Sequence, residues 1–443
     1  MVAGGIILFL QGLPACADTP KPYGLTARPP AQPGPVMPRS ITADLPKLLS
    51  QTGAFADVRR LTPAPALIPY DLIVPFWSDG AEKLRWMSLP TNSAVTFAPT
   101  GEWAFPEGTI FVKHFELATD ETHPDIKRRL ETRLLVRSSD GAVYGVTYKW
   151  RADNSDADLL TTNLTEDIEI KTAHGTRVQK WYYPSRADCL SCHTANAGLV
   201  LGVKTRQMNR DFAYPSGVTD NELRAWNHAG LFAAKLDEAA IPKLPTLARE
   251  EDTSRTLEDR ARSYLDANCA HCHRPHGTVA AFDARYDTPL EKQGLIGAPV
   301  LIDQRIDNPR VIAPNDIWRS LLYVRASTVE PMKMPPLAHN EVDVKSMMLL
   351  KQWIESLPGP PVLPPPVITP IGGHYDHPLT VTIQSQPGAR IYFTLDGTVP
   401  TTSDSPYTNA IALDKPTIVR AKAFEPGHTK SVTVQEVFII SSD

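Results

Sequence analysis

The sequence has little cysteine and no long run of charge of either sign. Five cysteines occur among 443 residues, and 45 Lys and Arg residues face 49 Asp and Glu residues, so the formal net charge is −4. This balance gives no indication of a nucleic-acid partner or of binding to an acidic membrane surface. The length exceeds that of a single domain of ~150 residues and predicts two to four domains.

The N-terminus lacks a basic residue before Lys21 and holds only a short apolar stretch, from Ile6 to Leu10. That stretch is too short to span a bilayer, but together with the small residues after it, residues 1–17 resemble a secretory signal. The sequence Leu-Pro-Ala-Cys that ends at Cys16 resembles a bacterial lipobox, in which the cysteine carries a lipid. An ordinary signal peptide that contains a cysteine is the alternative. We expect an exported protein, periplasmic or at the cell surface, with Cys16 as its candidate lipid anchor.

Proline, in contrast, is abundant: its 42 residues are roughly double the usual share. Because proline ends helices and removes a hydrogen bond from a strand, this content argues against a mostly helical protein. Two segments are especially rich in it. Residues 18–40 are predicted to be an exposed leader without folded elements, and residues 358–366 a semi-rigid polyproline linker.

Four of the five cysteines lie in two copies of one pattern, Cys-x-x-Cys-His, at 189–193 and 269–273. This is the attachment pattern of c-type haem, in which the two thiols bind the vinyl groups and the His binds the iron. A four-cysteine zinc site and two disulfides are the alternatives, and both leave the histidines unexplained. The pattern therefore predicts two covalent haem c groups. The residues that would hold them are Cys189, Cys192 and His193 in the first motif and Cys269, Cys272 and His273 in the second.

The second motif lies between two predicted helices. An amphipathic helix is predicted over 253–267, with Thr253 or Ser254 as its N-cap, and another over 342–357, with Asp343 near its start. Two further histidines lie close by: His271 is inside the motif, and His276 follows it. His271 and His276 are both expected at the surface.

Helix, motif, loop and closing helix, with Met-Pro-Pro at 334–336, resemble a class I cytochrome c domain. The resemblance implies an all-α fold over 246–357. It also implies that a Met in such a turn is the sixth ligand of the iron, which assigns Met334, with Met332 as the substitute. A Met that fills a gap in the core is the alternative reading of Met334.

The first motif lacks such flanking helices, because a predicted strand precedes it and ends at Pro184. Its haem is expected at the edge of a β domain, within a segment of residues 185–245. Two residues are candidates for the distal ligand of this haem iron. Met208 is favoured because it is near in sequence, and His228, at the end of a helix predicted to begin with a Thr219–Glu222 capping box, is the alternative.

Residues 41–184 contain short alternating segments, at 93–97, 109–115, 133–137 and 144–150, which predict an antiparallel β domain. No catalytic arrangement stands out among its residues. We expect this domain to be a scaffold that packs against one face of the first haem.

Residues 367–443 alternate with period two, which predicts strands. Segments 392–401, 405–407 and 421–423 closely resemble the small β-sandwich at the C-terminus of chitobiase-like β-hexosaminidases. The domain is accessory in those enzymes, so the resemblance implies no glycosidase activity. Contact with a glycan and a passive spacer role both remain open.

Together these features predict a multidomain α+β chain. Its expected order is an antiparallel β domain, a haem-bearing segment, an all-α cytochrome c-like domain and a C-terminal β-sandwich. The arrangement resembles bacterial dihaem c-type cytochromes, which implies electron transfer between redox partner proteins. The alternatives are a dihaem peroxidase or small-molecule oxidoreductase with an open sixth site at the first haem, and a surface module that binds glycan. We favour the electron carrier over the enzyme because only the second motif lies within a cytochrome c-like domain.

Overall fold

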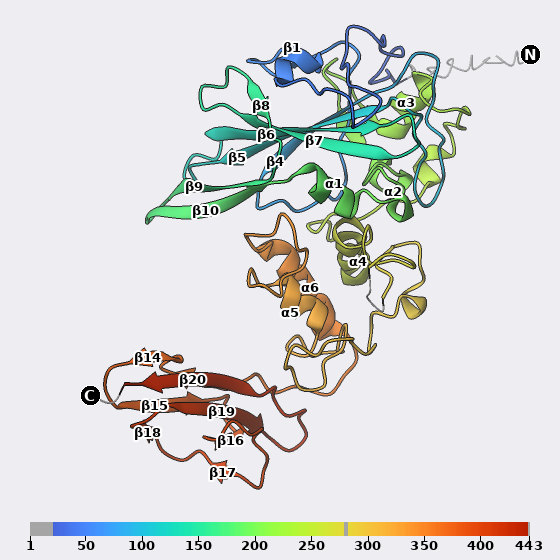
Figure 1. The fold of residues 1–443 in the computed structure, drawn as a ribbon. Helices are drawn as coiled ribbons and strands as arrows, with labels where there is room; N and C mark the ends of the chain where they lie inside the picture. Colours follow the sequence, from blue (N-terminus) through green and yellow to red (C-terminus); the bar gives the residue numbers. More distant parts are fainter. Residues whose placement is uncertain (1–20, 279–281, 442–443) are drawn as a thin grey trace, which may run out of the picture.

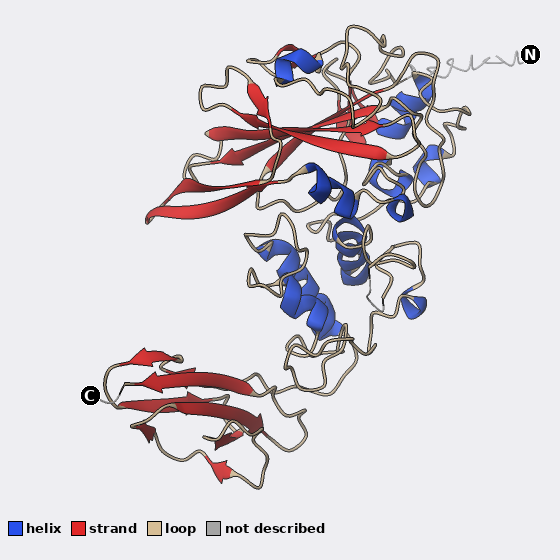
Figure 2. Ribbon diagram, in the orientation of Figure 1, coloured by secondary structure: helices blue, strands red, loops and turns tan. Residues whose placement is uncertain are grey.

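The computed structural model describes residues 21–278 and 282–441, which form three parts (Figure 1). A strand-rich part comes first, a helical part lies in the middle, and a β-sandwich follows, so the predicted mixed α+β architecture is confirmed (Figure 2). No helix among the described residues has the length and apolar character needed to cross a membrane. The signal-like residues 1–17, with Cys16, lie outside the described residues.

A six-stranded antiparallel sheet forms the centre of the first part, with its strands in chain order. Three of the predicted segments lie in its long inner strands, whereas 93–97 makes only isolated bridges, at Val95 and Thr96. The strands are β3 (Ile68–Pro69), β4 (Glu82–Ser88), β5 (Ile110–Ala118), β6 (Lys127–Arg137), β7 (Val143–Trp150) and β8 (Ala157–Leu159).

The two faces of this sheet have different surroundings. On one face Val112 and Leu134 are buried in a core that includes Leu49 from a 3-10 helix at Leu49–Thr52. On the other face Phe111 and Leu135 belong to a second core, which continues into residues beyond 185. Alternation of side chains along each strand produces this division, and it leaves the second face available to the cysteine motifs.

Smaller sheets flank the main one. Strands β1 (Phe55–Asp57) and β2 (Thr62–Pro63) form one pair. Strands β9 (Leu164–Thr172) and β10 (Gly175–Tyr183) form a long hairpin, and the latter ends before Pro184 as predicted. Buried residues of the hairpin pack on Phe115 of β5. The first motif therefore begins directly after this hairpin, beside the sheet.

Segment 185–245 is not a separate unit, because its apolar residues complete the second core of the β domain. Trp226 and Phe232 lie within this core against Trp103. Its elements are α1 (Arg186–Cys192), a 3-10 helix at Ala195–Ala197, α2 (Thr205–Met208), β11 (Asp211–Ala213), β12 (Thr219–Asn221), α3 (Glu222–His228) and a 3-10 helix at Ile241–Lys243.

The cap of α3 differs from the prediction. Asn221 is the N-cap and its side chain accepts hydrogen bonds from the backbone N–H groups of Leu223 and Arg224. Thr219 lies in β12, paired with Ala213. The pairing of β11 with β12 draws Thr219 into an extended conformation and moves the start of the helix two residues on.

The proline-rich leader is packed against the β domain from residue 21 onward, contrary to the prediction of an exposed spacer. The ring of Tyr23 stacks on His228, with 3.5 Å between ring centroids, and Gly24 N donates to Asp220 at 3.0 Å. Farther along, Met37 is buried and Val36 N donates to Thr52 O at 2.7 Å. Proline fixes the backbone of the leader without preventing such contacts.

The described residues of the central part form three α-helices, α4 (Leu257–Asn268), α5 (Leu321–Ala326) and α6 (Val344–Ser356), with a 3-10 helix at Leu290–Lys292. The predicted start of the first at Thr253 or Ser254 is wrong. Its N-cap is Thr256, whose hydroxyl accepts from Asp259 N at 3.0 Å. Asp343 caps α6 by accepting from Ser346 N at 3.2 Å, close to the predicted place.

Buried polar contacts join the helical part to the β domain. Lys204 and Asp266 form an ion pair at 2.6 Å, and Arg274, next to the second motif, pairs with Glu102 at 2.9 Å. Trp77 N also donates to the side chain of Asn268 at 2.7 Å. These contacts fix the second motif against the β domain.

The C-terminal β-sandwich has a three-stranded and a five-stranded sheet around an apolar core. The first contains β13 (Val367–Thr369), β15 (Leu379–Gln384) and β18 (Ile411–Leu413). The second contains β14 (Gly373–Tyr375), β16 (Arg390–Thr394), β17 (Ser405–Pro406), β19 (Thr417–Phe424) and β20 (Val434–Ile440).

The proline-rich linker 358–366 is part of this sandwich rather than a free spacer. Leu363 is fully buried, and its N–H donates to Thr429 O at 3.0 Å. Thr429 N in turn donates to Pro361 O at 2.8 Å. The sandwich therefore begins before residue 367, because proline carbonyls still accept hydrogen bonds where proline nitrogens cannot donate.

Candidate functional site

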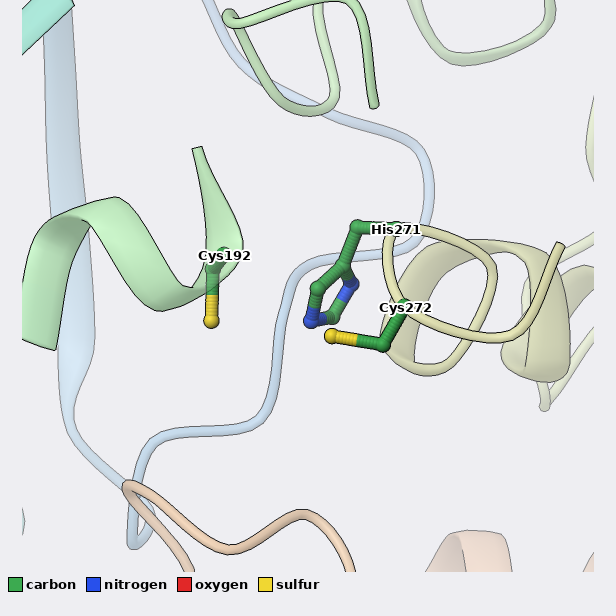
Figure 3. A group of neighbouring side chains, drawn as sticks. All are labelled: Cys192, His271 and Cys272. Atoms are coloured by element: carbon green, nitrogen blue, oxygen red, sulfur yellow. The ribbon is translucent and has the colours of Figure 1, made fainter. Parts of the chain in front are cut away.

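The two Cys-x-x-Cys-His motifs, 80 residues apart in sequence, open onto one cavity between the β domain and the helical part. We call it the central cavity, and its volume is 650 Å³. Sγ of Cys192, Sγ of Cys272 and a ring nitrogen of His271 lie within 4.8 Å of one another. Figure 3 shows Cys192 on α1 facing His271 and Cys272, which come from the loop after α4. All four motif cysteines line the cavity.

The first motif is held against the sheet by a short helix. Ser185 caps α1 by accepting from Asp188 N at 3.3 Å, and the Asp188 carboxylate accepts from Ser185 N at 2.8 Å. A Cβ at Gly145 of β7 would lie 2.6 Å from Sγ of Cys189. Glycine at 145 therefore permits the close approach that places Cys189 on the sheet.

The hydrogen bonding of His193 fixes which of its nitrogens is available. Nδ1 lies 2.8 Å from Leu199 O, and because a carbonyl only accepts, Nδ1 donates the proton. Nε2 keeps its lone pair and is the atom available to bind a metal. Burial lowers the pKa of His193 to about 4, so the ring is neutral at physiological pH. This is the ring state that a metal ligand requires.

The second motif continues directly from α4. Cys269 caps the helix through a bond from its N–H to Leu265 O at 2.9 Å, and His273 N donates to Cys269 O at 2.8 Å. The His273 ring stacks on Phe282, with 4.1 Å between centroids. Burial lowers the pKa of His273 to about 4, so it too is neutral. Unlike His193, its buried Nδ1 has no hydrogen-bond partner among the described residues.

The Met-Pro-Pro turn reaches the central cavity. Met334 lines the cavity, whereas Met332 is not among its lining residues. The turn is held by Arg325, whose carbonyl accepts from Met334 N at 2.9 Å and whose Nε donates to Met332 O at 2.7 Å. The structure thus brings the predicted thioether, His273 and both cysteines of the second motif to the same cavity.

Neither predicted distal ligand of the first motif reaches the cavity. Met208 is fully buried in the second core of the β domain, with Trp226. His228 is exposed at the end of α3, where it stacks on Tyr23. Both lie outside the set of cavity-lining residues. Proximity in sequence was a poor guide because the chain turns away into the core after Gly202.

Two residues of the site were missed at the sequence level. His271 faces Cys192 and lies edge-on to Phe76, with 5.9 Å between centroids, so the expectation of a surface position is wrong. Its Nδ1 is buried and has no hydrogen-bond partner in the part of the chain that the structure describes. Lys113 of β5 lines the cavity. The sequence contained a signal for Lys113, because in the alternating pattern of its strand it shares a face with the apolar residue Phe111.

The donors around the cavity suit a metal or a metal-containing cofactor. The closest group, Cys192, His271 and Cys272, has the ligand types of a zinc site. Among the described residues no group of all four cysteines is this close, so the four-cysteine zinc alternative lacks its geometry. The cavity is far larger than one ion needs, and its walls are mostly apolar or aromatic.

The comparisons with known proteins identify one domain. Residues 370–435 match the chitobiase/beta-hexosaminidase C-terminal domain family, which agrees with the resemblance found in the C-terminal strands. The match covers the β-sandwich and does not extend to the cysteine motifs. No curated protein and no solved structure matches the chain.

Proposed function

We propose that this chain is an exported dihaem c-type cytochrome that carries electrons between redox partner proteins. The observation that carries the proposal is the convergence of two Cys-x-x-Cys-His motifs on one central cavity, with Sγ of Cys192 and Cys272 within 4.8 Å. Unrelated dithiols have no reason to share a cavity of 650 Å³. Two cofactors attached there would lie close enough to exchange electrons directly.

The residues present fit haem. Each motif offers two thiols and a neutral imidazole to the cavity, and His193 has its Nε2 free. Loop residues Leu301 and Ile302 line the cavity although their exposed fractions are 66 % and 67 %. Exposed aliphatic side chains on a cavity rim are suited to cover a large apolar cofactor.

The roles of the chain's own residues follow from this fit. Cys189 and Cys192, and likewise Cys269 and Cys272, would each add an S–H across a vinyl group of haem, a step that consumes no oxidant. His193 and His273 would bind the two irons. Haem supplies reversible one-electron chemistry at iron.

Met334 is the proposed sixth ligand of the second iron, because it reaches the cavity and Met332 does not. A His/Met pair raises the reduction potential of haem iron relative to other ligand sets. The second haem would therefore hold electrons more tightly than a haem without a Met ligand. Buried apolar walls add to this effect.

Haem attachment of this type implies assembly outside the cytoplasm, and the proposal accordingly includes an exported, periplasmic or surface location. A lipid at Cys16 and a glycan contact through the C-terminal domain belong to the same proposal. The matched family supports the domain's identity, and the glycan contact is an extension of it.

A second candidate is a haem oxidoreductase that acts on peroxide or another small molecule. It is favoured by one observation, that Met208 and His228 both lie away from the cavity. An iron without a protein ligand at its sixth position would bind small molecules. Carbon monoxide binding to the reduced protein separates the two candidates: its absence at both haems contradicts the oxidoreductase.

The decisive experiment is a pyridine haemochrome assay on protein expressed with a cytochrome c maturation system. We expect two covalent haems per chain, falling to one in each double variant, C189A/C192A and C269A/C272A. Metal analysis of the same samples is the control. Protein with no covalent haem and one zinc per chain would overturn the proposal and assign Cys192, His271 and Cys272 to zinc.

The ligand assignment has its own test. Met334→Ala should abolish the ferric Met-to-iron absorption band, whereas the neighbouring variant Met332→Ala should keep it. An unchanged spectrum in Met334→Ala would remove Met334 from the iron.

A further inference from the structure

Three basic residues stand side by side on the cavity face of the main sheet. The strand register places Arg85 of β4 opposite Lys113 of β5, and Lys113 opposite Arg133 of β6. Residues directly opposite in adjacent strands share a face. Lys113 and Arg133 line the central cavity. We call Arg85, Lys113 and Arg133 the basic row.

The outer members of the basic row have carboxylate partners. Arg85 pairs with Asp71 at 2.5 Å, and Arg133 makes two hydrogen bonds to Glu131, at 3.0 and 2.6 Å. Arg85 is only 5 % exposed, and its Nη2 is buried with no partner among the described residues. These carboxylates therefore leave at least one N–H group of the basic row, Nη2 of Arg85, without an acceptor among the described residues.

Lys113, in the middle, has no carboxylate partner among the described residues. Its Nζ lies 5.3 Å from the ring centroid of Phe76 and 5.0 Å from that of Phe115. Burial, reinforced by the neighbouring charges of Arg85, lowers the pKa of Lys113 well below its usual value. In the absence of an anion, an ammonium group at this position is unfavourable.

Like charges directly opposite each other destabilise a sheet, and a buried charge without a partner costs far more. Three such residues in adjacent strands are tolerated when an anion completes the group. We propose that the basic row, with Lys113 at its centre, is a carboxylate-binding site that takes the carboxylate side chains of the haem at the first motif. This inference rests on the proposed function.

The position of the basic row matches the shape of that cofactor. The neighbouring row on the same face is Phe111, Leu135 and Gly145, and Gly145 touches Cys189. Lys113 lies two strands across from Gly145 and two residues along, which is ~10 Å by ~7 Å. Haem c carries its thioether bonds near one edge and two carboxylates at the opposite edge. An apolar row beside Cys189 and a basic row beyond it suit these two edges.

Lys113→Met in the full-length, haem-loaded protein tests the proposal. Haem content is measured first, because a protein without haem would fail the proposed function and not this inference. With both haems present, redox titration should show a lower midpoint potential for one haem, since removal of a cation favours the ferric state. The spin state of each haem should stay unchanged, and Lys113→Arg should restore the potential.

A matched control is Lys127→Met, which removes a lysine of β6 that pairs with Glu82 instead of facing the cavity. It should leave both potentials unchanged. Unaltered potentials in Lys113→Met would overturn the inference. Conversion of one haem to high spin would also overturn it, because Lys113 would then be an iron ligand. A wild-type midpoint that responds to added acetate would show that a diffusible carboxylate, and not the haem's own, uses the row.

Discussion

Gly145 of the main sheet lies directly against Cys189 of the first motif. Gly145→Ala places a methyl group 2.6 Å from Sγ and 2.8 Å from Cβ of Cys189, so α1 must shift away from β7. We expect haem content to fall from two toward one per chain, with the second motif still loaded. The pyridine haemochrome assay with peptide mapping of the attached haem measures this.

The control is Gly373→Ala, in a strand of the C-terminal sandwich, where the nearest side-chain atom is 3.8 Å from the added methyl. It should keep two haems. Full loading of the first motif in Gly145→Ala would contradict the claim that this close approach positions Cys189.

Glu222 predicts a dependence of stability on pH. Burial raises the pKa of its carboxyl well above 4.5, and Oε2 has no partner among the described residues. The folded state therefore holds the proton more tightly than the unfolded state. Its contribution to stability is present below about pH 4.5 and is lost as the pH rises through the folded-state pKa.

Glu222→Gln should remove that loss, because an amide cannot ionise, and should raise the free energy of unfolding at pH 8 by on the order of 1–3 kcal/mol relative to the buried carboxylate. Denaturant unfolding of both proteins at several pH values measures the difference. Glu251→Gln, at a side chain that is 67 % exposed, is the control. A wild-type advantage that grows with pH would contradict the assignment.

At the scale of elements, the cap of α4 decides where the helix before the second motif begins. Thr256→Ala removes the hydroxyl that accepts from Asp259 N and should destabilise the helical part by about 1 kcal/mol. Thr253→Ala should change little, because that exposed residue lies outside the helix. Thermal unfolding followed by helix circular dichroism compares the two. Equal losses would contradict Thr256 as the cap.

The sequence predicted the elements with strong local signals and missed those fixed by contacts at long range. The strand before Pro184, the start of α6 at Asp343 and the inner strands of the sheet follow from alternation and capping chemistry. The cap of α3 was misassigned because the pairing of β11 with β12 is stronger than the local preference of Thr219. Sequence likewise could not tell that the leader packs on Asp220, nearly 200 residues away.

The same limit applies to the candidate site. The two Cys-x-x-Cys-His motifs could be recognised in the sequence because the thioether attachment that we propose requires a fixed spacing. Which Met reaches the cavity, and which lysine lies beside it, depends on how the β domain and helical part meet. Met208 and Lys113 illustrate this: Met208 is near the first motif in sequence but does not line the cavity, whereas Lys113 is distant in sequence and does line it.

At the scale of the whole molecule, the C-terminal sandwich is docked on the helical part. Asp307 accepts from Lys422, and from Thr433 at 3.2 Å to the backbone and 2.9 Å to the hydroxyl. Arg319 donates to Ser431 O at 3.0 Å. The domain therefore has a fixed orientation relative to the central cavity.

Lys422→Met should loosen this docking, because Asp307 loses its charged partner. We expect faster proteolytic cleavage within 358–366 and unchanged haem content. Lys430→Met is the matched control, since that residue is exposed and contributes only its backbone carbonyl, to Arg319. Equal cleavage rates in the two variants would show that the ion pair does not hold the domain.

The packed leader sets how far the protein could stand from a membrane. A free segment from Cys16 to residue 40 would reach ~85 Å when extended, at no more than ~3.6 Å per residue. Because the chain is already bound to the β domain at Tyr23 and Gly24, only the residues before them can act as a tether. In the lipid-anchored form that we propose, the length from Cys16 to Tyr23 limits that reach to ~25 Å. Such a protein would meet its partners at the membrane surface and would be unable to sample the space beyond it.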